Sequence, residues 1–195
     1  MVGVLSSQDV ATLNKFSIPC LYYLCPLANI ESMIRNGVLS FNAASRQVKT
    51  FNSIANENVR RRRKTKWVGG RWLTDYANFY LRPWTPMQYN LQAKQDSFAV
   101  VKLSRELFGI NGMHFSDGNA ASNPTKFYTA LADLNNLDWQ IINTQYGFDR
   151  ESIRKRAAEV LIPDKAEPEF IEEICVMSTC AETNSNYTTD DTLFV

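Results

Sequence analysis

One carboxylate and one run of arginines have the clearest chemical potential in this sequence. Glu159 is a charged residue inside the otherwise apolar segment Ala157–Ile162. In a strand, such a residue either faces solvent at a sheet edge or projects into a cleft, where it can hydrogen-bond a substrate hydroxyl. Residues Arg60–Arg63 are consecutive. On a helix four consecutive side chains fan around the axis, so some of these arginines must face inward or toward a ligand.

The arginine run lies in a strongly basic segment. Between Arg46 and Arg71 there are nine basic residues and one acidic residue, whereas from Ala157 onward there are nine acidic residues and one basic residue. The formal net charge of +1 is thus the sum of two opposed regions and excludes only a uniformly basic coat. The same stretch is rich in rings: Trp67, Trp72, Tyr76, Phe79, Tyr80 and Trp84. Cations beside rings that stack bases are typical of single-strand binding, so we predict a polyanion site rather than the commoner solvated charge run.

Other reaction classes have little support in the sequence. His114 is the single histidine, and neighbouring Phe115 favours a packed strand position over a catalytic one. Cys20 and Cys25 have the same spacing as Cys175 and Cys180, which makes a four-cysteine zinc site conceivable. Residues five apart on a strand point to opposite faces, however, so we expect buried thiols and no metal. Sequence motifs of phosphate-binding loops, dinucleotide-binding turns and hydrolase elbows are absent.

The elements that must position these residues indicate an α+β fold around a mixed sheet. We expect strands at residues 18–24, 38–41, 97–103, 114–116, 157–162 and 174–177, and helices at residues 29–35, 54–66, 86–91 and 137–142. A further helix is expected to open at Asn123–Pro124, with Phe127 to Leu134 on it, and Gly69–Gly70 is expected to end the helix at 54–66. The segments before Ser53 and from 143 to 156 read as polar loops.

The chain of 195 residues has 45% hydrophobic residues, which suits one domain with a real core. We assign residues 1–178 to that domain and residues 179–195 to a C-terminal tail. The chain has neither an apolar run of about 20 residues, as a membrane helix needs, nor a secretory signal pattern, so we expect a cytoplasmic protein that makes no membrane contact.

These segments together resemble the DarT family of DNA ADP-ribosyltransferases, toxins that use NAD to modify bases in single-stranded DNA. The ordered matches run from Leu21 to Val176: Leu21-Tyr22-Tyr23-Leu24 with Asn29-Ile30, Gly37-Val38-Leu39-Ser40, Ser53-Ile54-Ala55 before the arginine run, Gly69-Gly70 with Asp75-Tyr76-Ala77-Asn78-Phe79-Tyr80, Pro86-Met87-Gln88-Tyr89, Phe115-Ser116-Asp117-Gly118-Asn119-Ala120-Ala121, Lys126-Phe127-Tyr128, Leu137-Asp138-Trp139 and Ala158-Glu159-Val160-Leu161. The resemblance implies an ADP-ribosyltransferase-like fold, with a split mixed sheet and short flanking helices.

The resemblance also implies roles for individual residues. Glu159 matches the catalytic glutamate, and Arg63 matches the catalytic arginine, with Arg62 as the nearest rival in register. The implied NAD-binding residues are Tyr22, Tyr23, Cys25, Asn29, Gly37, Leu39 and Arg63, and the implied DNA-binding residues are Arg60, Arg62, Trp67, Trp72, Tyr76 and Arg154. Residues 145–154 occupy the position of the family's substrate-recognition loop. Tyr23 and Thr74 stand where family members often have histidine, and Cys25 stands where they often have threonine.

A reaction that breaks the nicotinamide–ribose bond requires neither metal nor histidine. Glu159 would stabilise the developing positive centre and take the proton of the attacking base, and Arg63 would bind the NAD diphosphate or polarise the base. From the resemblance, guanine is slightly favoured over thymine as the acceptor, and a macrodomain antitoxin like DarG is the expected partner. Two alternatives stay open: a non-catalytic module that binds single-stranded nucleic acid, and an ADP-ribosyltransferase that modifies proteins.

Overall fold

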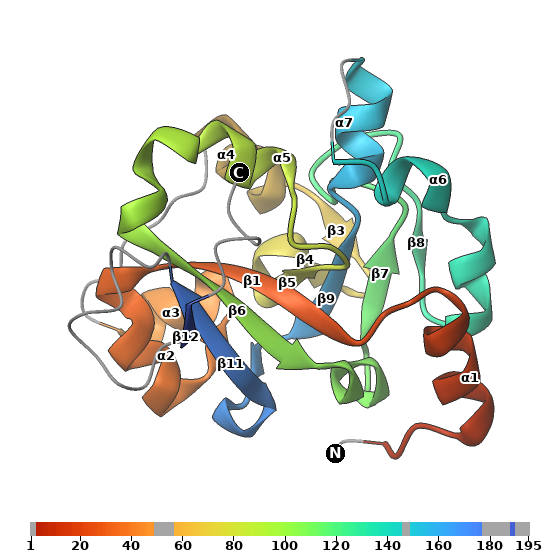
Figure 1. Cartoon of the computed structure of the whole chain (residues 1–195), viewed down its shortest axis with the longest axis horizontal. Coiled ribbons are helices and arrows are strands. Elements are labelled where there is room, and N and C mark those ends of the chain that lie inside the picture. The colour runs from red at the N-terminus through yellow and green to blue at the C-terminus, as the bar shows by residue number, and fades with distance from the viewer. Residues whose placement is uncertain (1–2, 49–56, 146–148, 177–187, 190–195) are drawn as a thin grey trace.

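An eight-stranded sheet forms the centre of the folded molecule (Figure 1). The computed structural model describes residues 3–48, 57–145, 149–176 and 188–189. The strand order is β12-β11-β6-β1-β5-β9-β7-β8, and every pairing is antiparallel except β11 with β12. The strands are β1 (Cys20–Pro26), β5 (Tyr76–Tyr80), β6 (Phe98–Ser104), β7 (His114–Ser116), β8 (Phe127–Tyr128), β9 (Glu159–Pro163), β11 (Ile171–Val176) and β12 (Thr188–Thr189).

The sheet is split between β1 and β5. Strand β1 pairs with β6 along its whole length, from Cys20 opposite Ser104 to Pro26 opposite Phe98. Its pairing with β5 is limited to Tyr22 opposite Tyr80. The two strands therefore diverge beyond this point, and the gap between them leaves room for a pocket. This arrangement confirms the predicted α+β fold with a split mixed sheet.

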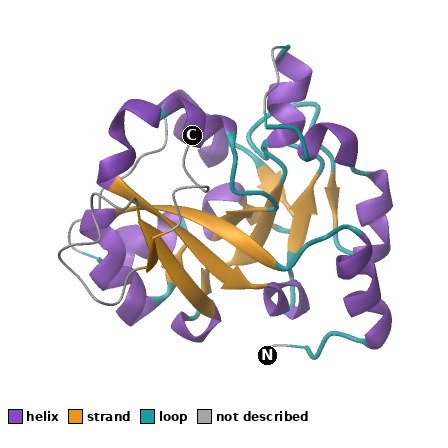
Figure 2. Ribbon diagram, viewed as in Figure 1, coloured by secondary structure: helices purple, strands orange, loops and turns teal. Residues whose placement is uncertain are grey.

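Short helices surround the sheet (Figure 2). Two small antiparallel ribbons accompany it, β2 (Val38–Leu39) with β10 (Lys165–Ala166) and β3 (Trp67–Val68) with β4 (Arg71–Trp72). The helices are α1 (Ser7–Lys15), α2 (Ile30–Asn36), α3 (Phe41–Gln47), α4 (Glu57–Lys64), α5 (Pro86–Asn90), α6 (Trp139–Ile142) and α7 (Arg150–Arg156). In Figure 1, α4, α5 and α7 lie at the top of the view, while α2 and α3 lie at the lower left and α1 at the lower right.

The core is a continuous apolar cluster that joins α1, the sheet and the short helices. Leu13, Leu21, Phe79, Val101 and Phe115 are fully buried within it. Burying such side chains contributes roughly 1.5–3 kcal/mol each, which fixes the strands that carry the polar residues of the pocket. The predicted strands at 18–24, 97–103, 114–116 and 157–162 are confirmed within a few residues.

Three segments differ from the sequence prediction because tertiary pairing or capping overrides the local pattern. The helix expected after Pro124 is instead strand β8 followed by a 3-10 helix at Leu131–Asn136. Phe127 and Tyr128 pair with β7, and the Tyr128 ring stacks on Phe115 with 5.5 Å between centroids. The cross-strand contacts outweigh a helical spacing of apolar residues.

Both predicted polar loops contain a helix with an identifiable N-cap. In α3 the Ser40 hydroxyl accepts a hydrogen bond from the Ala43 N–H at 3.1 Å. In α7 the Asp149 carboxylate accepts from the N–H groups of Glu151 and Ser152 at 3.0 and 2.9 Å. These caps satisfy amide groups that a helix start leaves free. Helix α1, which the sequence analysis did not predict, begins with a capping box of Ser6 and Asp9.

The basic helix ends two residues earlier than expected. Of the range 54–66, the structure describes residues from 57 onward, and α4 ends at Lys64. Gly69 and Gly70 form the turn between β3 and β4, with φ values of +54° and +84°, instead of ending the helix.

Within the predicted tail, residues 188–189 pair with β11 as strand β12. The described residues include no helix long and apolar enough to cross a bilayer.

Candidate active site

A pocket of about 620 Å³ lies where β1 and β5 diverge. Its volume falls within the range of small-molecule sites. Strand β1 contributes Tyr23 and Cys25, β5 contributes Asn78 and Tyr80, and Glu159 begins β9. Helices α4, α5 and α7 contribute further lining residues. Segments distant in the sequence therefore meet at one site.

Glu159 is held at this pocket by hydrogen bonds to both of its carboxylate oxygens. Its residue is 2% exposed. Oε2 accepts from Arg63 Nη1 at 2.9 Å, and Oε1 accepts from the Ala120 N–H at 3.0 Å. Its own N–H donates to the Ser116 hydroxyl at 3.1 Å. Because β9 lies between β5 and β7, Glu159 is not an edge residue, and the structure places it in a cleft.

The arginine run fans around α4 as the sequence indicated. Val59, Arg60 and Arg63 line the pocket, which is the i, i+1, i+4 pattern of one helix face, whereas Arg61 and Arg62 are exposed. The Arg63 side chain is 13% exposed and forms the ion pair with Glu159. Between the two candidates for the catalytic arginine, Arg63 is therefore the one that reaches the glutamate.

Arg63 also carries a donor that no described residue uses. Its Nη2 atom is buried and has no hydrogen-bond partner in the described part of the chain. A buried guanidinium N–H without a partner costs free energy, so its presence in a pocket points to an acceptor oxygen on a ligand. Together with Arg60 and the rings of Tyr23 and Tyr80, this donor set fits an anionic ligand that carries rings, as NAD does.

Burial keeps the hydroxyl and thiol groups of the pocket protonated. Burial raises the pKa of Tyr80 well above its usual range, and the negative charge of Glu159 adds to the effect while Arg63 opposes it. The pKa of Tyr23 is also raised, chiefly by burial. The pKa of the Cys25 thiol rises to about 12 for the same reason. At neutral pH these groups therefore serve as neutral donors or packing surfaces.

Most of the predicted NAD-binding residues meet in the pocket. Tyr23, Cys25, Asn29, Gly37 and Leu39 line it, as do Arg63 and Glu159. Tyr22 does not: it packs against the separate apolar cluster of Leu24, Phe98, Val100 and Cys175. Alternation along β1 explains this difference, because adjacent side chains point to opposite faces.

Gly37 has a structural reason to be glycine. Its φ is +79°, and a Cβ at this position would come within 3.0 Å of the Ala166 carbonyl carbon. Glycine at this position therefore allows α2 to end and the backbone to lie close to Ala166 of β10. The requirement for glycine is explained by this backbone contact.

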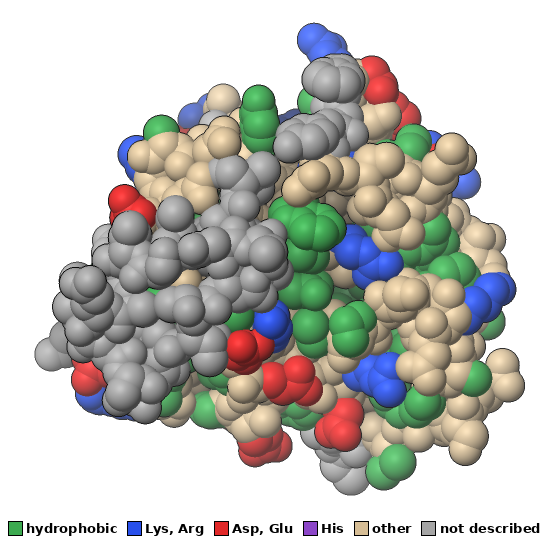
Figure 3. Space-filling view, viewed as in Figure 1, with side chains coloured by type: hydrophobic (Ala, Val, Ile, Leu, Met, Phe, Trp, Pro, Cys, Tyr) green, Lys and Arg blue, Asp and Glu red, His purple; other side chains and the backbone are tan. Residues whose placement is uncertain are grey.

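The predicted DNA-binding residues are more dispersed. Arg60 and Tyr76 line the pocket. Trp67 and Trp72 lie opposite each other on the β3–β4 hairpin, edge to face at 4.7 Å, and are 57% and 45% exposed. Arg62 is exposed on α4. Arg154, on α7, has only a small exposed fraction and forms an ion pair with Asp117. On the face shown in Figure 3, lysine and arginine side chains stand apart and do not form one basic patch.

Several pocket residues were not assigned to the site by the sequence analysis, and three of them show why. Asn78 and Tyr80 come from β5, and Ile153 comes from α7. The signal for the first two was present: Tyr76, Asn78 and Tyr80 alternate with buried Ala77 and Phe79 at the period of a strand. The density of aromatic residues around them masked that period. Ile153 could not be found because residues 143–156 read as a loop.

His114 and Cys20 lie outside the pocket, as does Cys175, whereas Cys25 lines it. His114 donates a hydrogen bond from Nδ1–H to the Gly112 carbonyl at 2.9 Å and packs edge-on against Tyr76. The side chains of Cys20, Cys25 and Cys175 are buried, and Cys180 lies outside the described residues. Among the described residues, no group of three or more His, Cys, Asp or Glu side chains is placed to hold a metal ion.

Comparison with known proteins gives a consistent family match. Residues 22–190 match the family model described as ssDNA thymidine ADP-ribosyltransferase, DarT. A DNA ADP-ribosyl transferase–DNA ADP-ribosyl glycohydrolase fusion protein of Thermosipho africanus is 29% identical over 163 residues, which cover 80% of this chain and 42% of the relative. A DNA ADP-ribosyl transferase of Thermus sp. is 27% identical over 169 residues, 81% of each chain. The chain thus spans less than half of the fusion protein.

Solved structures share the fold. Thermus sp. 2.9 DarT in complex with ADP-ribosylated ssDNA superposes with a TM-score of 0.79 at 21% identity, covering 92% of this chain and 97% of the other. The same protein in complex with NAD+ gives a TM-score of 0.73 at 21% identity, covering 91% and 98%. At this level of identity the superpositions establish the common fold.

Proposed function

Because the chain belongs to the DarT family of ssDNA thymidine ADP-ribosyltransferases, we propose that it transfers ADP-ribose from NAD to a base in single-stranded DNA. The observation that carries this proposal is the buried pair of Glu159 and Arg63 beside an unused arginine donor. Neither a metal nor a histidine is needed for the chemistry described below.

In this proposal Glu159 acts at the ribose. NAD supplies a ribose carbon joined to nicotinamide, a good neutral leaving group. The Glu159 carboxylate stabilises the positive charge that develops at this carbon and accepts a hydrogen bond from a ribose hydroxyl. As the nicotinamide–ribose bond breaks, a base nitrogen bonds to the same carbon, and its proton passes to Glu159.

Arg63 supports both partners of this step. Its Nη1 fixes Glu159, and its Nη2 is free to donate to an oxygen of the diphosphate or of the base. Tyr23 and Tyr80 add neutral rings to the wall of the pocket. A base must leave its stack to enter such a pocket, which favours a single-stranded substrate.

The test uses purified protein, NAD and single-stranded oligonucleotides that each contain one kind of modifiable base. We expect one oligonucleotide to gain the mass of one ADP-ribose while nicotinamide is released. The resemblance favours guanine as the acceptor, whereas the description of the family model names thymidine as the acceptor. Each base is therefore presented separately. Retained DNA binding without nicotinamide release would support a non-catalytic binder, and labelled protein with unmodified DNA would support a protein-directed transferase.

The hairpin carrying Trp67 and Trp72 is proposed to stack bases that flank the modified one. Exposed indoles beside Lys66 and Arg71 suit this role, and stacking contributes about 1–3 kcal/mol per base. Replacing Trp67 by Ala is expected to weaken oligonucleotide binding by about 5–150-fold in a fluorescence titration. Replacing it by Phe, which keeps a ring, should retain most of the affinity. Equal losses in both variants would contradict a stacking role.

We also propose that this chain works with an ADP-ribosyl glycohydrolase that removes the mark. The Thermosipho africanus relative carries both activities in its name, and the family resemblance implies a macrodomain antitoxin. A DNA product of this protein that a DarG-like macrodomain restores to its original mass would support the pairing. A product that resists such an enzyme would contradict it.

A further inference from the structure

We infer that Arg154 is a positioning residue for Glu159, acting through the loop of residues 117–125 rather than by contact with DNA. This inference rests on the proposed function, because its consequence is measured as ADP-ribose transfer. The evidence is a chain of hydrogen bonds that leads from the guanidinium group to the carboxylate.

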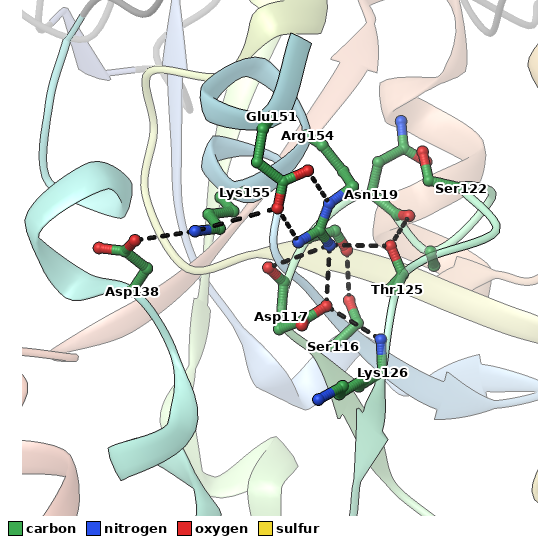
Figure 4. A network of polar contacts seen from close by, with 12 residues as sticks. Ser116, Asp117, Asn119, Ser122, Thr125, Lys126, Asp138, Glu151, Arg154 and Lys155 are labelled. Atoms are coloured by element: carbon green, nitrogen blue, oxygen red, sulfur yellow. Dashed lines mark hydrogen bonds and ion pairs between the residues drawn. The ribbon is translucent and has the colours of Figure 1, made fainter. Parts of the chain in front are cut away.

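All three nitrogen atoms of the Arg154 guanidinium donate to protein partners (Figure 4). Nε and Nη2 donate to the two carboxylate oxygens of Glu151, at 2.9 and 2.7 Å. Nη1 donates to Asp117 Oδ1 at 2.9 Å and to the Thr125 hydroxyl at 3.1 Å. The side chain is only 9% exposed, and these ion pairs raise the pKa of Arg154. A DNA phosphate would have to displace contacts that are already made.

Two of these partners, Asp117 and Thr125, are the two ends of one loop. Asp117 Oδ1 also accepts from the Lys126 N–H at 3.0 Å, which closes the base of the loop. At its centre, Asn119 donates its N–H to the Arg154 carbonyl at 2.8 Å and accepts from the Thr125 hydroxyl at 2.7 Å. Arg154 thus holds the loop through both its side chain and its backbone.

The loop in turn holds the catalytic carboxylate. The Asn119 side chain accepts from the Ala121 N–H at 2.9 Å, which shapes the turn around Ala120. Ala120 then donates its N–H to Glu159 Oε1 at 3.0 Å. From the other side, the Ser116 hydroxyl donates to the Gly118 carbonyl at 2.7 Å and accepts from the Glu159 N–H. A shift of the loop therefore changes the hydrogen bonding of Glu159.

The close approach of the loop to α7 is an independent sign of this coupling. A Cβ on Gly118 would lie 2.8 Å from the Arg154 carbonyl oxygen, closer than real Cβ atoms come to such an atom. Gly118 therefore lets the loop seat against Arg154. The preceding residue on α7, Ile153, lines the pocket, so the same turn of helix forms the wall of the site and fixes its carboxylate.

The experiment compares the variants Arg154→Ala and Arg150→Ala in steady-state transfer to the oligonucleotide that the wild type modifies. Arg150 is an exposed arginine of the same helix and serves as the control. For Arg154→Ala we expect kcat to fall about 10–100-fold, with the KM and the directly measured Kd for DNA within about twofold of wild type. Arg150→Ala should match the wild type.

A pH profile separates positioning from a loss of folded protein. A carboxylate that loses an N–H donor is less stabilised in its charged form, so the acid limb of kcat should move to higher pH in Arg154→Ala. A smaller folded fraction would lower kcat without moving that limb. Arg154→Lys is expected to recover kcat only in part, since lysine cannot hold Asp117 and Glu151 with a planar fork.

A second variant keeps the test valid if Arg154→Ala folds poorly. Thr125→Val removes the hydroxyl between Arg154 and Asn119 and should lower kcat in the same direction. A raised KM and Kd for DNA at unchanged kcat would overturn the inference in favour of DNA contact, as would kcat within twofold of wild type in both variants. A wild type that modifies no oligonucleotide would overturn the proposed function instead.

Discussion

Two arginines with similar burial differ in how completely protein partners use their hydrogen-bond donors. Arg63 on α4 makes one ion pair, with Glu159, and leaves Nη2 buried without a partner in the described chain. Arg154 on α7 donates from all three nitrogen atoms to Glu151, Asp117 and Thr125. A saturated arginine stabilises the fold around it, whereas an unsaturated one retains a donor for a ligand. The difference lies in the partners, since both residues occur in basic runs of short helices.

The largest effect is expected from removing the carboxylate that Arg63 contacts. Replacing Glu159 by Gln keeps an acceptor for the Ala120 N–H but removes the charge and the general base. We expect ADP-ribose transfer to fall by about 10²–10⁴-fold. Oligonucleotide mass gain measures the loss, and a filter-binding titration should show unchanged DNA affinity. Transfer within a few-fold of wild type would remove Glu159 from the chemistry.

The next effect addresses the free donor of Arg63. Arg63→Lys keeps the positive charge but lacks the second N–H group in a fixed plane. Initial rates of nicotinamide release are expected to fall by about 10²–10³-fold, the usual loss when one transition-state donor is removed. The control is Arg61→Lys, an exposed neighbour on α4, which should keep the wild-type rate. If Arg63→Lys were fully active, charge alone would account for the role of Arg63.

For the free energy of unfolding we expect the opposite order: removing the contacts of Arg154 should cost more than removing the Arg63–Glu159 pair. The double variant Arg154→Met with Asp117→Asn loses the four side-chain hydrogen bonds that Arg154 makes to Glu151, Asp117 and Thr125. Its free energy of unfolding should drop by about 4 kcal/mol, at about 1 kcal/mol each. In Arg63→Met with Glu159→Gln both charges leave a buried site together, so the change should stay within about 1 kcal/mol. Urea unfolding measures both. A larger loss for the Arg63 pair would invalidate the contrast.

The smallest effect concerns alkaline pH. Burial raises the folded-state pKa of Tyr23 and Tyr80 above the unfolded value of about 10. Their contribution to stability is therefore complete below about pH 10 and is lost as pH rises further, by up to about 1.4 kcal/mol per pH unit for each phenol. The ion pairs of Arg154 keep their charge in this window, because its pKa is raised too.

Denaturant midpoints recorded from pH 8 to 11 test this difference. We expect the wild type to lose stability above about pH 10, and Tyr80→Phe to lose it less steeply, since phenylalanine has no proton to release. An alkaline slope that is unchanged in Tyr80→Phe would assign the loss to other groups.

The candidate site was largely predictable at the level of residue identity. Glu159 was recognisable as a charge in an apolar strand, and a helical run of arginines required that some face inward. Tyr23 and Cys25 were named through the resemblance to the family, which places them on its NAD-binding strand. Asn78, Tyr80 and Ile153 were missed because their segments were not recognised as a strand and a helix. For Arg154 the sequence shows the charge, which led to the predicted DNA contact, but it does not show the protein partners that the structure reveals.

By itself the sequence determined the family, the α+β class and the strands whose apolar, β-branched character is local. Tertiary structure decided three other things: that Phe127 and Tyr128 form a strand, that Arg63 rather than Arg62 reaches Glu159, and that Arg154 donates to protein partners from all three nitrogen atoms. Each depends on contacts between residues far apart in the chain, such as the Arg63–Glu159 pair or β8 on β7. Local propensity differs by less than about 1 kcal/mol between such options, so packing and hydrogen bonding select among them.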